Sequence, residues 1–251
     1  MHYDWWQWTL LALGAGIVGF SKTGIPGFGI LFVAVFANVM PARQATGVVL
    51  PLLMFGDLFS VVLYRRHLEW RQVWRLFPWT FAGVVLGWLA LGRINDAQTT
   101  RLVGGILAFM LGLHVWRRAS SVEGGGQDAL SLHATPVLAA TCGVLAGFTT
   151  LVANAAGPVM VLYLLSMRLG KMEFLGTSAA FFLLLNWTKV PFVLQLGLIN
   201  TDSLALNLWL APAVIGGALL GRWVIGRIEQ KHFENTALAL TAAATVKLLV
   251  F

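Results

Sequence analysis

Apolar segments fill almost the whole of this 251-residue chain and leave no room for a sizeable water-soluble domain. Hydrophobic residues make up 58% of the chain and charged residues only 11%, whereas an average soluble domain has about 25% charged residues. A chain of this composition is solvated by lipid, and its backbone groups must be satisfied within the protein. We therefore expect an all-α, polytopic membrane protein that folds as one integrated domain.

Composition also argues against several other classes of protein. The net charge of +7 does not indicate a nucleic-acid partner, because the basic residues lie between apolar segments and are typical of topology determinants. A single cysteine, Cys142, excludes an intrachain disulfide. The histidines form no metal-ligand pattern, and no nucleophile and base stand together. The sequence therefore predicts no enzyme, no metal site and no cofactor.

Two glycine-rich breaks interrupt the apolar segments. The first runs from Gly19 to Gly29, Gly-Phe-Ser-Lys-Thr-Gly-Ile-Pro-Gly-Phe-Gly. It recurs about 128 positions later as Gly147 to Gly157, Gly-Phe-Thr-Thr-Leu-Val-Ala-Asn-Ala-Ala-Gly. Paired broken segments in the two halves of a membrane chain point to the binding site of a transporter.

The breaks belong to a longer internal repeat. We divide the chain into a first membrane repeat at 1–116, a cytoplasmic linker at 117–133 and a second membrane repeat at 134–251, with about five hydrophobic segments in each repeat. The fourth segments align at an offset of 134, and each carries a Gly-x-x-x-Gly face that favours close helix packing. Such faces are equally compatible with a homodimer. The aligned residues are Pro78, Gly83, Gly87 and Arg93 with Pro212, Gly217, Gly221 and Arg227.

The segment after each break is too short to cross a bilayer alone. A helix over 30–40 rises only about 16 Å, against about 30 Å of hydrocarbon. It either continues its predecessor as a discontinuous helix, which gives a parallel repeat, or forms a short or re-entrant pair, which gives an inverted repeat. The inverted arrangement places eleven of fifteen loop lysines and arginines on one side, whereas the parallel one divides them seven to eight. Because basic loops concentrate in the cytoplasm, we expect inverted repeats with both termini outside.

The residues of the breaks are suited to binding an anion. Ser21, Lys22 and Thr23 offer two hydroxyls and an ammonium, and a helix starting near Ile30 would point its positive N-terminal end at them. Alternatively, the Lys22 side chain extends from a short helix to the membrane–water interface. In the second break a helix begins at Pro158, and Asn154 either binds substrate or caps this helix. The predicted site, a single pocket built from both breaks, comprises Ser21, Lys22, Thr23, Gly24, Gly27, Gly29, Thr149, Thr150, Asn154 and Gly157.

Three further polar residues lie inside apolar segments, where ionisable groups are functional candidates. Asp57 aligns with Thr188, which lies between Asn186 and Lys189. We interpret Asp57, Asn186 and Lys189 as a coupling or gating group. Alternatively, Asp57 pairs with a cation while Lys189 extends to the interface.

The two breaks together resemble the TauE/SafE family of sulfite exporters. The likeness continues through Gly176 to Ala179 and Asn186 to Pro191, and covers essentially the whole chain. It implies a permease of the bacterial cytoplasmic (inner) membrane for sulfite or a sulfonate such as sulfoacetate, driven by protons. The chain departs from the glycine-rich Gly-x-Gly-Gly-Gly form of many members, because Ser21 to Thr23 stand there.

The sequence thus predicts a secondary transporter that carries a small sulfur-containing anion by alternating access. An anion channel built on the same breaks, or a permease for anions without sulfur, is the competing prediction.

Overall fold

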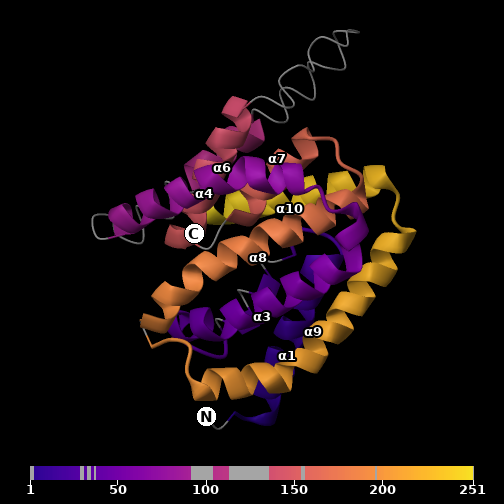
Figure 1. Cartoon of the computed structure of the whole chain (residues 1–251). Coiled ribbons are helices and arrows are strands. Elements are labelled where there is room, and N and C mark those ends of the chain that lie inside the picture. The colour runs from indigo at the N-terminus through magenta and orange to yellow at the C-terminus, as the bar shows by residue number, and fades with distance from the viewer. Residues whose placement is uncertain are drawn as a thin grey trace. The chain divides into compact units, whose positions relative to one another are not determined.

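The computed structural model describes residues 3–28, 31–32, 35–36, 38–91, 104–112, 136–153, 156–195 and 197–250. Within these ranges the regular elements are helices, and no strand occurs. The prediction of an all-α protein is thus confirmed for the described part of the chain. The elements are α1 (Trp5–Thr23), α3 (Ala42–Tyr64), the short 3₁₀ helix η1 (Arg65–His67), α4 (Trp70–Leu91), α6 (Pro136–Ala153), α7 (Ala156–Ser166), α8 (Lys171–Gln195), α9 (Thr201–Arg227) and α10 (Gln230–Val250) (Figure 1).

Four stretches of these helices are long and apolar enough to cross a membrane. Shorter apolar stretches occupy Pro136–Leu151 and Ala156–Ser166. These lengths and compositions support the prediction of a membrane protein that crosses the bilayer several times. The four long stretches are Gly47–His67, Trp70–Ala90, Lys171–Gln195 and Thr201–Arg227.

The chain divides into two compact units, and each unit takes helices from both sequence repeats. Unit 1 comprises Met1–Leu68 and Lys171–Phe233, and unit 2 comprises Glu69–Gly170 and Glu234–Phe251. The compact units therefore cut across the repeat boundaries at 116 and 134. The predicted linker at 117–133 lies outside the described residues.

In unit 1, α1 and α3 both pack against α9, and α3 also packs against α8 (Figure 1). Side-chain hydrogen bonds satisfy backbone groups at both ends of α9. Asn200 caps its start by accepting a hydrogen bond from the Ser203 backbone N–H at 2.9 Å. At its other end, the Lys171 ammonium donates to the carbonyls of Ile225 and Ile228. The core between these helices includes Leu11, Ala15, Val18, Phe36, Leu52, Leu206, Leu210 and Val214.

The short segment after the first break also contributes to this core. Residues 31–32 and 35–36 are helical, and Phe32 and Phe36 are buried against α1, α3 and α9. The predicted helix start near Ile30 lies outside the described residues.

Glycines allow α1 and α9 to cross with their backbones in contact. A Cβ atom on Gly19 would lie 1.9 Å from the Val214 carbonyl oxygen, and one on Gly217 would lie 1.9 Å from the Gly16 carbonyl oxygen. Real side chains do not tolerate such distances, so only glycine fits at either position. The crossing explains the glycine-rich faces seen in the sequence.

The same crossing recurs in unit 2, between α6 and α4. A Cβ on Gly147 would lie 2.0 Å from the Thr80 oxygen, and one on Gly83 would lie 2.1 Å from the Val144 oxygen. These pairs are equivalent to the pairs in unit 1 under the sequence repeat. The offset of 128 takes Gly16 and Gly19 to Val144 and Gly147. The offset of 134 takes Thr80 and Gly83 to Val214 and Gly217. In both units, the first helix of one repeat therefore packs against the fourth segment of the other. The opposite orientation of the two repeats stays a prediction.

The helix of the second break begins earlier than we predicted. α7 starts at Ala156, so Pro158 is its third residue and not its first. Proline is accepted there because the N–H groups of the first helical turn have no partner within the helix. α6 extends to Ala153, so Thr149 and Thr150 of the predicted break are helical.

The close crossing of α1 and α9 can be tested with two adjacent glycines of α9. Gly217→Ala should destabilise the protein by about 1–3 kcal/mol, because the new methyl group meets the backbone of α1. Gly216 has no atom within 4 Å of the place where its Cβ would be, so Gly216→Ala should be neutral or stabilise the helix by up to about 1 kcal/mol. Thermal unfolding in detergent measures both effects. Equal unfolding temperatures for the two variants would contradict the crossing.

Candidate functional site

The first break begins later than the sequence suggested, because α1 runs through Ser21 and Lys22 to Thr23. These three residues form the last turn of a helix, and the irregular backbone starts at Gly24. The end of α1 thus presents carbonyl groups around these side chains. The physical reason is that α3 and α9 supply partners for the last turn, so the helix need not unwind at Gly19.

Side chains of α3 satisfy the carbonyls at the end of α1. The Ser60 hydroxyl donates to the Lys22 carbonyl at 2.8 Å, and the Tyr64 hydroxyl donates to the Thr23 carbonyl at 2.5 Å. The Gly24 backbone N–H donates to the Phe20 carbonyl at 2.8 Å. The last carbonyls of a helix have no partner within it, so these bonds allow α1 to end inside the protein.

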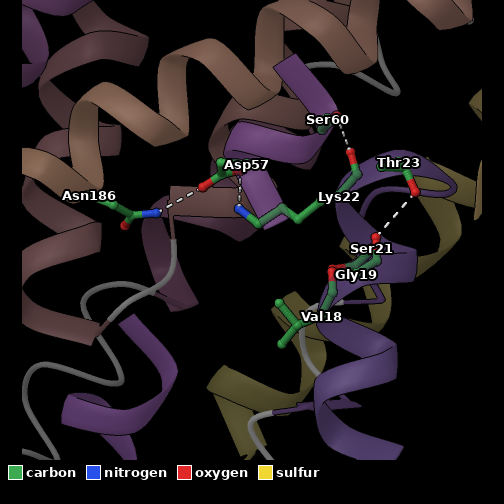
Figure 2. Close-up of polar contacts among 8 residues, drawn as sticks. All are labelled: Val18, Gly19, Ser21, Lys22, Thr23, Asp57, Ser60 and Asn186. Carbon is green, nitrogen blue, oxygen red and sulfur yellow. Dashed lines mark hydrogen bonds and ion pairs between the residues drawn. The ribbon is translucent and has the colours of Figure 1, made fainter. Parts of the chain in front are cut away.

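An ion pair joins α1 to α3 at the same place. The Lys22 ammonium lies 2.7 Å from Oδ1 of Asp57, whose side chain is fully buried, while that of Lys22 is 13% exposed (Figure 2). Asn186 of α8 donates from Nδ2 to Oδ2 of Asp57 at 3.0 Å. The Lys22 ammonium also lies 4.6 Å from the centre of the Phe182 ring, within the range of a cation–π interaction. Lys22 therefore reaches into unit 1 and supplies the cation that the alternative interpretation foresaw for Asp57. Lys189, which the same alternative extended to the interface, is buried.

Lys189, which is buried, belongs to the same electrostatic cluster. Its residue is 9% exposed, and it is attracted by Asp57 and repelled by Lys22. It lies three residues after Asn186 on α8 and seven after Phe182, so the three residues share one helix face. Two lysines and one aspartate thus interact electrostatically inside unit 1. We call Lys22, Asp57, Asn186 and Lys189 the buried charge cluster.

The hydroxyls predicted to bind substrate donate their protons to nearby carbonyls. Ser21 donates to the Val18 carbonyl at 2.9 Å, and Thr23 donates to the Ala218 carbonyl at 2.6 Å. In unit 2, Thr149 donates to the Leu145 carbonyl at 2.7 Å. Hydroxyl oxygens that donate in this way retain lone pairs, which suit a cation or a donor better than an anion. Lys22 is therefore the residue of the first break that can offer charge-assisted donors to an anion.

The glycines of the first break allow a close helix contact and an unusual backbone conformation. Gly24 lies against α9, because a Cβ there would be 2.9 Å from the Cα of Gly221. Gly27 has φ 99°, a conformation that favours glycine. Thr149, Thr150 and Gly157 lie in unit 2, so the single pocket built from both breaks stays a prediction. Gly29 and Asn154 lie outside the described residues.

Sequence reasoning did not single out Gly56, Ser60, Tyr64 or Phe182 as members of the site. Gly56 leaves room for the Lys22 side chain, whose Cγ would lie 3.2 Å from a Cβ at that position. A signal was present, because Asp57, Ser60 and Tyr64 follow the helical spacing of three and seven residues that places them on one face. In the described part of the chain, no three histidine, cysteine, aspartate or glutamate side chains gather as metal ligands would.

The fold and the site define a helical membrane protein of several spans with a buried charge cluster inside one compact unit. The family model described as Sulfite exporter TauE/SafE matches residues 10–248. The chain therefore belongs to the TauE/SafE sulfite exporter family, as the resemblance of the two breaks suggested. Comparison with curated proteins and with solved structures finds no similar chain.

A double-mutant cycle tests the energetics of the Lys22–Asp57 pair. Asp57→Leu or Lys22→Met alone should lower the stability by about 3–5 kcal/mol, because each leaves a buried charge without its partner. The double variant should recover most of this loss, since it removes both charges together. Thermal unfolding in detergent provides the comparison. If the two single effects simply add in the double variant, the two side chains are not paired.

Proposed function

We propose that this protein is a secondary transporter of the cytoplasmic membrane that moves a small sulfur-containing anion, such as sulfite or a sulfonate like sulfoacetate, by alternating access with protons as the coupling ion. Membership of the sulfite exporter family supports the class of activity. The observation that carries the proposal is the buried charge cluster, in which Lys22 and Lys189 face one carboxylate, that of Asp57.

The charge balance of the cluster favours an anionic substrate. Charged groups within a membrane span are expensive and are normally paired with one another. Two lysines and one aspartate contribute to this cluster, and a bound anion would give the lysines a further partner. The Lys22 ammonium carries three donors and is paired with Asp57 through its charge, so it can also donate to a sulfite or sulfonate oxygen.

The repeat supports a carrier mechanism. The equivalent close crossings of α1 with α9 and of α6 with α4 relate the two sequence repeats at the level of the backbone. In carriers with inverted repeats, the substrate site lies near the midplane, and one bundle moves against the other around it. The excess of basic residues in one set of loops supports a topology with both termini outside.

Counterflow in liposomes tests the proposed transport. We expect unlabelled sulfite or sulfoacetate inside the vesicles to drive transient accumulation of the labelled anion, because a carrier exchanges substrate without net flow. In Lys22→Gln the affinity should fall about tenfold to a hundredfold, which corresponds to the loss of a charge-assisted hydrogen bond of about 1.5–3 kcal/mol. Lys231→Gln, an equal change of charge at an exposed position of α10, should leave transport unchanged.

The outcome also separates a carrier from a channel. Conductance without saturation and without counterflow would show that the protein is an anion channel and not a carrier. Counterflow of carboxylates in preference to all sulfur anions would show that it is a carrier for another class of anion. An unchanged affinity in Lys22→Gln would show that the buried charge cluster does not bind the substrate.

A further inference from the structure

We propose that Arg65, Arg66 and Arg222 form a binding site for the phosphate of an anionic membrane phospholipid, such as phosphatidylglycerol. The site joins the end of α3 to α9 within unit 1. It is distinct from the buried charge cluster, and its occupant stays in the membrane and is not transported. This inference goes beyond the proposed function and does not depend on it.

The three arginines gather around Tyr64, the last residue of α3. The Arg222 guanidinium of α9 lies 5.4 Å from the centre of the Tyr64 ring. Arg65 and Arg66 directly follow Tyr64 and begin η1. Since a 3₁₀ helix rises only about 2 Å per residue, both start close to the place where α9 contacts Tyr64. The ring itself is buried, whereas all three arginines are exposed, so positive charges from two helices meet at one point of the surface.

These three charges have no acidic partner in the described part of the chain. No ion pair among the described residues joins a carboxylate to any of the three arginines. Like charges held near one another repel, and an anion shared between them replaces this repulsion by attraction. A phosphate diester suits the role, because its oxygens accept the paired N–H donors of guanidinium groups in a geometry that lysine does not offer.

The place of the arginines along their helices favours a lipid over a soluble anion. They lie near the ends of two stretches that can cross a membrane, Gly47–His67 and Thr201–Arg227. Exposed apolar side chains precede them on both helices, namely Val62 at 59% and Leu219 at 53%. Such side chains face acyl chains, while arginines near the end of a span extend to the headgroups. Basic residues between membrane helices bind anionic headgroups in this arrangement.

Tyr64 also connects the proposed lipid site to the end of α1. Its hydroxyl donates to the Thr23 carbonyl at 2.5 Å, and its ring lies beneath Arg222. A phosphate held by arginines of both helices would therefore strengthen the packing of α3 against α9 and, through Tyr64, against the end of α1. We expect the bound lipid to stabilise the folded protein.

Titration of the delipidated protein in a neutral detergent tests the site. The probes are phosphatidylglycerol and phosphatidylcholine with the same acyl chains, and inorganic phosphate. Phosphatidylglycerol should raise the unfolding temperature in a saturable manner, because a ligand that binds only the folded state stabilises it. Phosphatidylcholine, which has no net charge, should leave it unchanged. Inorganic phosphate should give no comparable shift, since it lacks the acyl chains. Native mass spectrometry measures the affinity for each lipid.

Single substitutions assign the binding to these arginines. Arg222→Gln and Arg65→Gln should each lower the affinity for phosphatidylglycerol about fivefold, the ratio that corresponds to the usual contribution of one arginine near an anionic membrane surface. Arg65→Gln should also leave the unfolding temperature unchanged in detergent without lipid, because the exposed Arg65 side chain has no partner among the described residues. If Arg222→Gln does not fold, Arg65→Gln decides.

Arg227 provides a matched control on α9. Its guanidinium lies over the ring of Trp223 at 3.9 Å, and five helical positions place it on another side of α9 from Arg222. Arg227→Gln should therefore retain the wild-type affinity for phosphatidylglycerol.

Several results would overturn the lipid site. Equal shifts with the two lipids, or a full shift with inorganic phosphate, would show that no anionic phospholipid is selected. A loss in Arg227→Gln as large as that in Arg222→Gln would show a general attraction of the basic surface and no site. Wild-type affinity in both Arg65→Gln and Arg222→Gln would place the lipid elsewhere. None of these measurements involves counterflow of sulfur anions, so the proposed function stands or fails separately.

Discussion

A helix that ends inside a membrane protein must have its last carbonyl groups satisfied by other parts of the chain, and α1 ends in this way at Thr23. Ser60 and Tyr64 of α3 donate to the carbonyls of Lys22 and Thr23. Without these two hydroxyls the end of α1 would need water or would unwind. The same contacts hold the Lys22 side chain beside Asp57, so the capping of one helix also determines the electrostatics of the buried charge cluster.

The close crossing of α1 and α9 provides the second constraint. Thr23 can donate to Ala218 because Gly19 and Gly217 allow the two backbones to touch. In lipid, where burial of apolar surface contributes little to helix association, packing of small residues and interhelical hydrogen bonds supply the attraction. The equivalent glycines in unit 2 serve α6 and α4 in the same manner. The repeat is therefore visible in the packing of the backbone as well as in the sequence.

The buried charge cluster shows how a transporter can carry charged groups within its spans. The Lys22 ammonium and the Asp57 carboxylate compensate each other at 2.7 Å. Asn186 of α8 adds a hydrogen bond to the same carboxylate, so three helices hold the buried carboxylate in place.

The sequence by itself determined the class of the protein, because the proportion of apolar residues and the lengths of the runs admit only a helical membrane protein. It also predicted the repeat, the close packing at Gly83 and Gly217, and Lys22, Asp57, Asn186 and Lys189 as functional candidates. Composition and spacing suffice for these features, since they depend on chemistry that is local in the chain. The tertiary structure alone decided which of these residues meet. Asp57 and Asn186 are 129 positions apart in the chain, and the donors that end α1 come from another helix, so the hydroxyls of Ser21 and Thr23 turned out to serve carbonyls. Those outcomes depend on how whole helices cross, which no single stretch of sequence records.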